Sequence, residues 1–431
     1  MKNRWKRTWE SYILRRYNGL MEAKKLWTHD FAIITAGTVI SMFGNALTGF
    51  AASLMVLDYT VSTFLYSICL AIYTVPQIVM PMISGAILDR FSRKRAIYML
   101  DFLSAGLYGL AALLVATNHF SPLLLGIYLF LIGSISSIYA VAYDSFYPLL
   151  VAEENYQRAY SIAAILETIS AVMVPVAAFV YNRWGIAPVF VIDAISFFLA
   201  ASMETRIGAD EKYIARQRNT RSETKAARQV IKDMKEGMQY LHSERGLWYV
   251  TLYFAASSIV GGCSTALTLP YFRETYANGE YVYMVVWGMA LLGRALGGSY
   301  HYRHTMRRQK KYEIALFVYV ATNLIEGLYL FCPVPVMAVL CFVSGVLGIT
   351  SYTIRVSGTQ AYVPDEKKGR FNGAFNMLNT TGALIGEVSG GALSQTVGSR
   401  LVILLYMLAC AGAAVIFIGL HRNAVSKIYN R

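Results

Sequence analysis

The sequence predicts an all-α membrane protein with twelve transmembrane helices, arranged as two similar six-helix bundles. Of its 431 residues, 56% are hydrophobic and only 15% are charged, whereas soluble domains carry about 25% charged residues. Apolar stretches long enough to cross about 30 Å of hydrocarbon, which takes about 20 residues, fill nearly the whole chain. A weak internal repeat at about half the chain length indicates two related halves.

Twelve apolar stretches have the length of a transmembrane helix, and a polar segment separates the first six from the last six. The predicted spans are 31–57, 63–88, 96–117, 121–146, 159–182, 186–203, 247–270, 282–302, 313–332, 335–362, 373–394 and 401–420. We therefore expect an N-terminal segment over 1–30, a bundle over 31–204, a linker over 205–245, a second bundle over 246–421 and a tail over 422–431.

The basic residues fall almost entirely on one side of the predicted spans. Of the 39 Lys and Arg residues, 34 lie on the side of the termini, whereas only Arg183, Arg273 and Arg400 lie on the other. The positive-inside rule then places both termini in the cytoplasm of a multi-pass cell-membrane protein. The net charge of +14 reflects orientation and contact with anionic lipid, so we expect no nucleic-acid partner.

The N-terminal segment and the cysteines add two further expectations. Residues 1–30 have no apolar region of the kind a signal peptide needs. Aromatic and aliphatic residues recur among bases at helical spacing, which favours an amphipathic helix on the membrane surface, with a basic disordered tail as the alternative; they are Trp5, Trp9, Tyr12, Ile13, Tyr17 and Leu20. The five cysteines show no C-x-x-C spacing, so we expect buried apolar thiols and no metal site.

The internal repeat supports the division into halves. At an offset of about 212 residues, 149–168 lies over 361–380, which pairs Glu153 with Asp365 and Arg158 with Arg370. Both stretches follow one predicted span and begin another. The same offset places Gly85 on Gly297.

The loop between the second and third spans, GAILDRFSRKR over 85–95, joins an acid and four bases to a glycine. Any cytoplasmic loop can hold bases, and an Asp can simply cap the next helix. The stretch nevertheless resembles the loop 2–3 signature of the major facilitator superfamily, G-x-x-x-D-R-x-G-R-K/R. The matching residues are Gly85, Asp89, Arg90, Arg93 and Lys94, while Ser92 replaces the second glycine.

The resemblance implies a carrier that works by alternating access, with this loop as a latch on the cytoplasmic side. Asp89 would meet the exposed N–H groups near Asn372–Asn376, at the start of the eleventh span. In the second-half copy, Gly297 is kept but His301 stands where the acid should be. That departure implies a weakened second latch, with a pH-sensing histidine as the alternative.

A narrower resemblance concerns direction and cargo. The loops over 153–161 and 364–372 and the opening 27–47 are similar to the macrolide-efflux and enterobactin-exporter-like branch of the drug:proton antiporters. The resemblance implies efflux of an amphipathic small molecule, such as a drug, a macrolide-like compound or a siderophore, driven by the proton gradient without a cofactor. In the fifth span, Pro175 fits the antiporter motif, but Ala177 and Ala178 replace its glycines, and the proline could simply kink the helix.

Ionisable residues inside the spans are candidates for coupling because charge at membrane depth is costly. Glu167 is the first candidate to carry a coupling proton, Glu387 the second, and Asp144 is also a candidate. Asp144 and Arg355 are nearly repeat-equivalent, so they could pair as a gate, with separate partners as the alternative. For the other acids we expect Asp101 to be structural and able to pair with the bases of 93–95, Asp193 to be structural or close to lipid, and Glu326 to be isolated. The candidates for the substrate cavity are Asn45, Gln360 and Pro175.

Three classes of function remain at this point. The leading one is a proton-coupled exporter, and the second keeps the fold but carries a lipid-linked molecule or imports a nutrient. The third, a membrane-embedded enzyme or sensor, has no catalytic carboxylate pair, metal-ligand spacing, nucleophile elbow or P-loop to support it. We therefore expect a monomeric carrier without enzymatic activity, whose partners are a small amphipathic substrate and the lipid bilayer.

Overall fold

The computed structural model describes residues 26–88, 91–119, 121–151, 173–209, 235–304 and 306–430, together with 159, 162, 166, 170 and 232. Within these ranges every regular element is helical. The longer helices are α2 (His29–Thr60), α3 (Thr63–Leu88), α4 (Arg93–Ala116), α5 (Pro122–Phe146), α7 (Met173–Trp184), α8 (Ala187–Glu204), α11 (Arg245–Thr275), α12 (Gly279–Arg303), α13 (Lys311–Leu328), α14 (Val334–Tyr362), α15 (Asp365–Val397), α16 (Ser399–Ala413) and α17 (Arg422–Tyr429). Three short 3₁₀ helices are η1 (Tyr147–Leu150), η3 (Arg308–Lys310) and η4 (Tyr329–Phe331), and η5 (Ala414–Gly419) is a π-helix that follows α16; all four lie within the described residues.

The predicted fold class, an all-α membrane protein, is confirmed. Ten of the described segments are long and apolar enough to cross a membrane. The predicted eleventh span corresponds to α15, which has 33 residues but is rich in Gly, Asn, Thr and Ser. The predicted fifth span ends in α7, which the structure describes only from Met173 onwards.

The chain forms two compact units. The first contains Met1–Ala52 and Met80–Ser222, and the second contains Ser53–Val79 and Glu223–Arg431. The end of α2 and most of α3 therefore lie with helices of the second half. The predicted bundle limits, 31–204 and 246–421, stay a prediction, since contacts assign the segment 53–79 differently.

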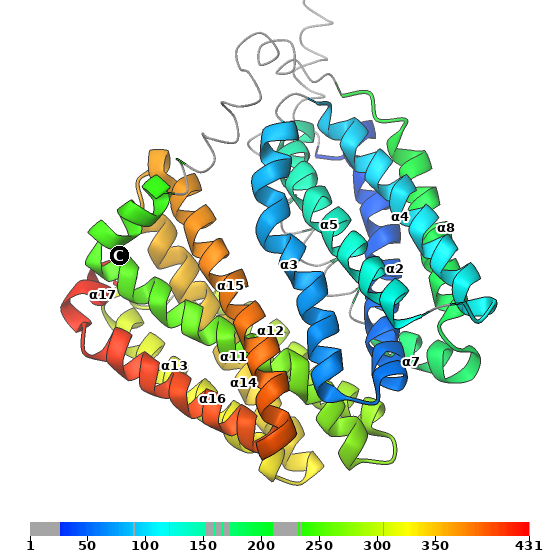
Figure 1. Cartoon of the computed structure of the whole chain (residues 1–431). Helices are drawn as coiled ribbons and strands as arrows, with labels where there is room; N and C mark the ends of the chain where they lie inside the picture. Colours follow the sequence, from blue (N-terminus) through cyan, green and yellow to red (C-terminus); the bar gives the residue numbers. More distant parts are fainter. Residues whose placement is uncertain are drawn as a thin grey trace, which may run out of the picture. The chain divides into compact units, whose positions relative to one another are not determined.

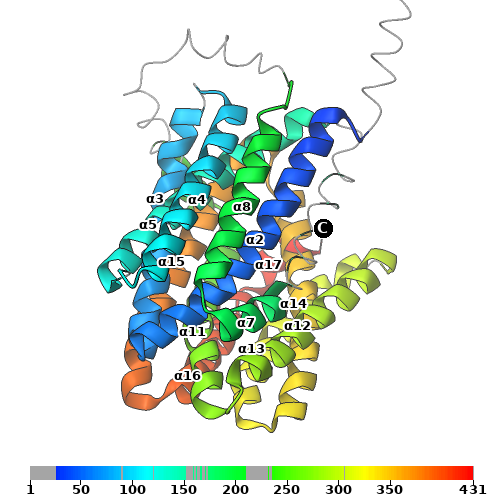
Figure 2. The same cartoon turned by 90° about the vertical axis from the view of Figure 1, so that its right-hand side faces the viewer.

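In the first unit, α4 packs along α8 and against α5 (Figures 1 and 2). Aromatic rings fill this seam: Tyr108 of α4 stacks on Phe197 of α8, with ring centroids 5.5 Å apart. Tyr128 of α5 meets Tyr108 edge to face at 5.9 Å. Such aromatic pairs stabilise beyond the area that they bury, so this seam holds the three helices in a fixed register.

In the second unit, α11 packs on α15, α12 on α14 and α13 on α16 (Figure 1). The α11–α15 seam has glycine on both sides. A Cβ on Gly262 would overlap the backbone of Ala383, and a Cβ on Gly386 would overlap the backbone of Ile259. Transmembrane helices use such small residues to bring their backbones into contact, because van der Waals packing drives their association. The glycines of α15 thus explain why this predicted span is polar by composition.

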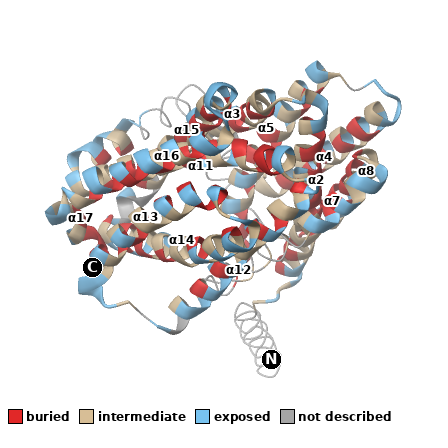
Figure 3. Cartoon of the chain, turned by 90° about the horizontal axis from the view of Figure 1, so that it is seen from below, coloured by how far each residue is buried: buried red, intermediate tan, exposed pale blue. Residues whose placement is uncertain are grey.

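The outer faces of the helices carry large apolar side chains, as expected of helices that meet lipid. In Figure 3 pale blue exposed positions run along α8 and α16. On α8 these include Ile192, Ile195 and Phe198, and on α16 Leu401, Leu405 and Leu408. A soluble protein rarely exposes contiguous apolar surface of this extent, so these faces are lipid-facing.

The C-terminal tail predicted over 422–431 is not a loose extension. Residues 422–429 form α17, which contacts α11, α13 and α14. Val425, Ile428 and Tyr429 are fully buried, and the hydroxyls of Tyr429 and Tyr319 are hydrogen-bonded at 2.9 Å. This helix was not predicted because it is too short and too polar to resemble a transmembrane span.

Candidate functional site

The loop 2–3 signature is described only in part. Gly85 lies in α3, while Asp89 and Arg90 lie outside the described residues, so the latch role of Asp89 stays a prediction. Beyond them, Arg93 donates to the carbonyl of Ser145 at 2.9 Å, and Lys94 donates to the carbonyl of Ile207 at 2.9 Å. Both bases therefore tie the start of α4 to main-chain groups at the ends of α5 and α8.

Ser92 replaces the signature glycine and caps α4. Its hydroxyl accepts a hydrogen bond from the backbone N–H of Arg95 at 3.1 Å. We expect Ser92→Ala to destabilise the protein by about 1 kcal/mol, whereas Ser92→Gly should cost only a few tenths. Thermal unfolding in detergent measures both variants. Equal losses for Ala and Gly would contradict the capping role.

The second-half copy of the signature packs closely but lacks an acid. A Cβ on Gly297 would lie 2.7 Å from Cγ2 of Ile349, so α12 and α14 meet at this glycine. His301 lies within hydrogen-bond distance of the Thr350 hydroxyl, with Nε2 and Oγ1 2.7 Å apart. The histidine thus joins the two helices of one pair, and whether it also forms a weakened latch stays a prediction.

Of the two predicted coupling acids that lie within the described residues, Glu387 is the one in a buried, polar position. It is only 6% exposed. Thr74 of α3 donates a hydrogen bond to its Oε1 at 3.2 Å, and Oε2 has no hydrogen-bond partner among the described residues. Four residues further along α15, a Cβ on Gly391 would overlap the Ser67 side chain of α3. One face of α15 therefore packs on α11 through Gly386, and the neighbouring face turns Glu387 towards α3.

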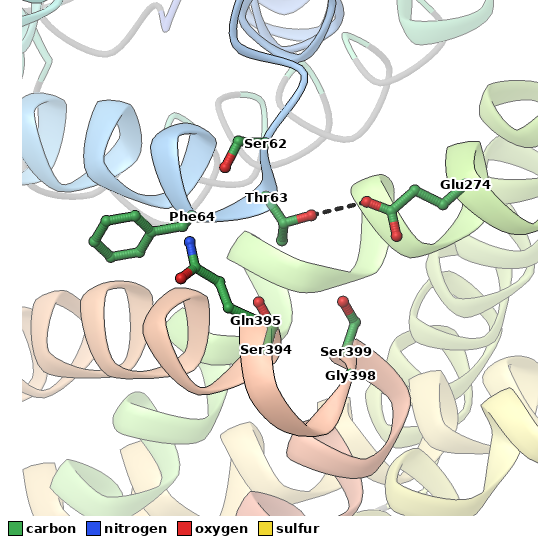
Figure 4. Close-up of a pocket in the computed structure, with 8 residues that line it drawn as sticks. All are labelled: Ser62, Thr63, Phe64, Glu274, Ser394, Gln395, Gly398 and Ser399. Carbon is green, nitrogen blue, oxygen red and sulfur yellow. Dashed lines mark hydrogen bonds between the residues drawn. The ribbon is translucent and has the colours of Figure 1, made fainter.

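A polar cluster missed by the sequence analysis lies at the end of α11. Arg273 forms an ion pair with Asp58 at 2.6 Å and also donates to the carbonyl of Leu54 at 3.3 Å. Beside it, the hydroxyl of Thr63 donates to Glu274 at 2.9 Å (Figure 4). Arg273 was counted only as one of three bases on the side away from the termini. No local sequence pattern around Arg273 indicated that its partner, Asp58, lies more than 200 residues away.

These contacts border a small polar cavity of about 220 Å³. It lies where α3 begins and where α15 passes into α16, as Figure 4 shows. The residues that line it are Ser62, Thr63, Phe64, Glu274, Ser394, Gln395, Gly398 and Ser399. The cluster therefore joins the end of α2 and the start of α3 to the end of α11 within the second unit, and each of these exposed polar contacts is worth little by itself.

Arg355 is surrounded by aromatic rings. Its guanidinium carbon lies 5.0 Å from the ring centroids of Phe254 and Phe375 and 5.4 Å from that of Tyr352. This is cation–π geometry. Asp144 is exposed near the end of α5 in the first unit, so the predicted gate pair of Asp144 and Arg355 stays a prediction.

The remaining site candidates within the described residues lie on three different helices, α14, α2 and α7. Gln360 donates to the side chain of Asn372 at 3.0 Å, which joins α14 to the start of α15. Asn45 of α2 and Pro175 of α7 are exposed. Glu167, the first coupling candidate, lies outside the described residues. Glu326 was predicted to be isolated, and this is wrong: Ser344 of α14 donates a short hydrogen bond to it.

A buried group of acids in the first unit also differs from the expectation. Asp101 does not pair with the bases of 93–95: both of its oxygens lack a hydrogen-bond partner among the described residues. Its neighbour is Glu204, the last residue of α8. Glu204 was missed because it falls at the boundary between the sixth span and the linker. Asp193 is completely buried and accepts a hydrogen bond from Ser196, which fits the structural alternative expected for it and not the lipid-facing one.

Comparison with known proteins agrees with this architecture. The profile of the Major Facilitator Superfamily matches residues 34–387. Macrolide efflux protein A of Streptococcus pyogenes is 25% identical over 292 residues, 66% of this chain and 70% of that protein. The MFS-type transporter YfiS of Bacillus subtilis is 24% identical over 379 residues, 82% of each chain.

Among solved structures, the nucleoside transporter NupG superposes with a TM-score of 0.65 at 13% identity and covers 91% of this chain and 99% of its own. At this identity the likeness establishes the fold. The family match spans most of the predicted helices of both halves and includes the loop 2–3 signature. The chain therefore belongs to the major facilitator superfamily and is a multi-pass membrane transporter.

Proposed function

We propose that this transporter exports amphipathic small molecules and is driven by the inward movement of protons. The observation that carries the proposal is Glu387, a nearly buried carboxyl on α15 with one oxygen hydrogen-bonded to Thr74 and the other without a partner in the described part of the chain. Charge at membrane depth is costly, so an acid there with no base beside it favours its protonated form. Such an acid can take up a proton on one side of the membrane and release it when water reaches it from the other. Glu167 and Asp144 remain further candidates for the same role.

The proposed cargo rests on chemistry and on similarity. The name of the Streptococcus pyogenes relative supports a macrolide-like, amphipathic compound. Arg355 and its aromatic neighbours on α11, α14 and α15 combine apolar ring surface with one fixed cation. Drug-sized ligands bind to mainly apolar walls with few polar groups, so this arrangement suits a large molecule with a polar head.

Import of a nutrient is the second candidate. NupG, which has the same fold, is a nucleoside transporter. The shared fold does not decide direction or cargo, since one fold hosts many functions. The two proposals differ in the compound whose transport is coupled to protons. They also differ in direction: compound and proton move in opposite directions in export, and together in import.

The test uses the purified full chain in lipid vesicles that contain a pH-sensitive dye. With an imposed pH gradient, a macrolide on the proton-rich side should stay there, while macrolide inside the vesicles should leave as protons enter. A nucleoside should produce neither effect. Nucleoside uptake together with protons would contradict export and support import. Exchange of a labelled lipid between leaflets without proton movement would contradict both.

A further inference from the structure

Three carboxyl groups are buried among the described residues of the first unit. Asp101 of α4 and Glu204 of α8 are each 1% exposed, and Asp193, three turns before Glu204 on the same face of α8, is completely buried. The carboxyls of Asp101 and Glu204 face each other. Two ionised carboxylates in contact and away from water repel each other and lose their hydration, so at least one of them must hold a proton.

The backbone of α2 covers this group of acids. A Cβ on Gly37 would lie 2.9 Å from Oε1 of Glu204, and a Cβ on Gly44 would overlap the carboxyl of Asp193. These two glycines are seven residues apart, two turns of one helix face. The acids of α8 therefore lie directly against main chain, and any larger residue on this face of α2 would displace them.

No base compensates the acids within the described residues. Arg93 and Lys94, the bases at the start of α4, donate to the carbonyls of Ser145 and Ile207. In the described part of the chain, none of the four carboxyl oxygens of Asp101 and Glu204 has a hydrogen-bond donor as a partner. The other titratable groups that face the pair are Asp193, Tyr139 and Tyr143. None of them carries a positive charge.

Two hydroxyl groups beside the acids have no hydrogen-bond partner among the described residues, which is unusual for a purely structural cluster. Thr48 is 3% exposed, its hydroxyl has no hydrogen bond of good geometry among the described residues, and it points at Asp193. The hydroxyl of Tyr139 is likewise buried and unbonded and faces the pair. Such groups can donate to a carboxylate once it has lost its proton, so the surroundings can accept both protonation states.

We propose that Asp101 and Glu204 form a carboxyl pair that shares one exchangeable proton, a second proton-binding site separate from Glu387. Within the described residues, no three His, Cys, Asp or Glu side chains are arranged to hold a metal ion, which favours a proton over a divalent cation. Glu204 ends α8, so the pair lies close to one end of its bundle, and the proposed proton would exchange through that end. Its use in driving transport rests on the proposed function, but its protonation does not.

The test counts protons without any transported compound. Purified chain in buffer-free detergent is moved from about pH 6 to about pH 9, a range in which exposed carboxyls stay ionised. Asp101→Asn/Glu204→Gln should release about one proton per chain less than the unmodified protein, because one shared proton is lost. The control Glu313→Gln, an exposed acid paired with Arg422, should release as many as the unmodified protein.

Equal release from the double variant and the unmodified protein would overturn the proposal. Release that occurs only on addition of Na⁺ would assign the pair to sodium and would also overturn it. If the double variant does not purify as a monodisperse protein, infrared spectra of Glu387→Gln give the answer. The carbonyl band of a protonated carboxylic acid should be present at the lower pH and lost at the higher, and its absence would refute the shared proton.

Discussion

Glu387→Gln is expected to lower proton-driven transport at least tenfold while leaving downhill exchange of the substrate intact. The amide keeps the shape of the side chain and can still accept the hydrogen bond from Thr74, but it cannot bind and release a proton. Coupling between two ligands is worth about 1–3 kcal/mol, or about 5- to 150-fold. Substrate uptake against its gradient, measured in vesicles with and without a pH gradient, separates coupling from binding.

Two companion variants sharpen this result. Thr74→Val removes the donor to Glu387 and should give an intermediate loss that depends on external pH. Glu313→Gln removes an exposed acid and should behave as the unmodified protein. Full proton-driven transport by Glu387→Gln would exclude this acid as the coupling group and leave Glu167 and Asp144 as candidates.

Ten of the twelve predicted spans coincide with described helices that are long and apolar enough to cross a membrane, because span length and hydropathy are local properties. It also selected Glu387, since an acid inside an apolar stretch is visible without knowing the fold. The partners of the acids were not predictable in this way. Asp101 was assigned to bases one or two turns away along its own helix, whereas its actual neighbour, Glu204, lies about 100 residues later. Nearness in sequence was the wrong guide to that contact.

Two further features escaped for physical reasons that the structure makes plain. The ion pair of Arg273 with Asp58 joins the end of α2 to the end of α11, and no local pattern marks either residue as paired. The predicted division of the chain into two bundles was placed at the linker because the segment 205–245 is polar. Contacts instead place the segment 53–79 with the second unit, because the start of α3 packs on α15 through Ser67 and Thr74.

Gly262→Ala is expected to be among the most destabilising single-methyl changes in the second unit. The added methyl would overlap the carbonyl and Cα of Ala383, which belong to the backbone of α15. A backbone cannot turn aside as a long side chain can, so α11 and α15 must separate. Overpacking of this kind typically costs about 1–3 kcal/mol. The separation would also move Glu387, which lies four residues beyond Ala383 on α15.

Gly261→Ala provides the matched control, since it makes the same chemical change one position earlier on α11. A Cβ at Gly261 would meet nothing within 4 Å, so this variant should be neutral or slightly more stable, because Ala favours a helix over Gly. Thermal unfolding of both variants in detergent, followed by proton-driven transport in vesicles, measures the difference. Similar melting temperatures for the two would contradict the close contact of α11 and α15. Loss of transport confined to Gly262→Ala would connect that contact to the placement of Glu387.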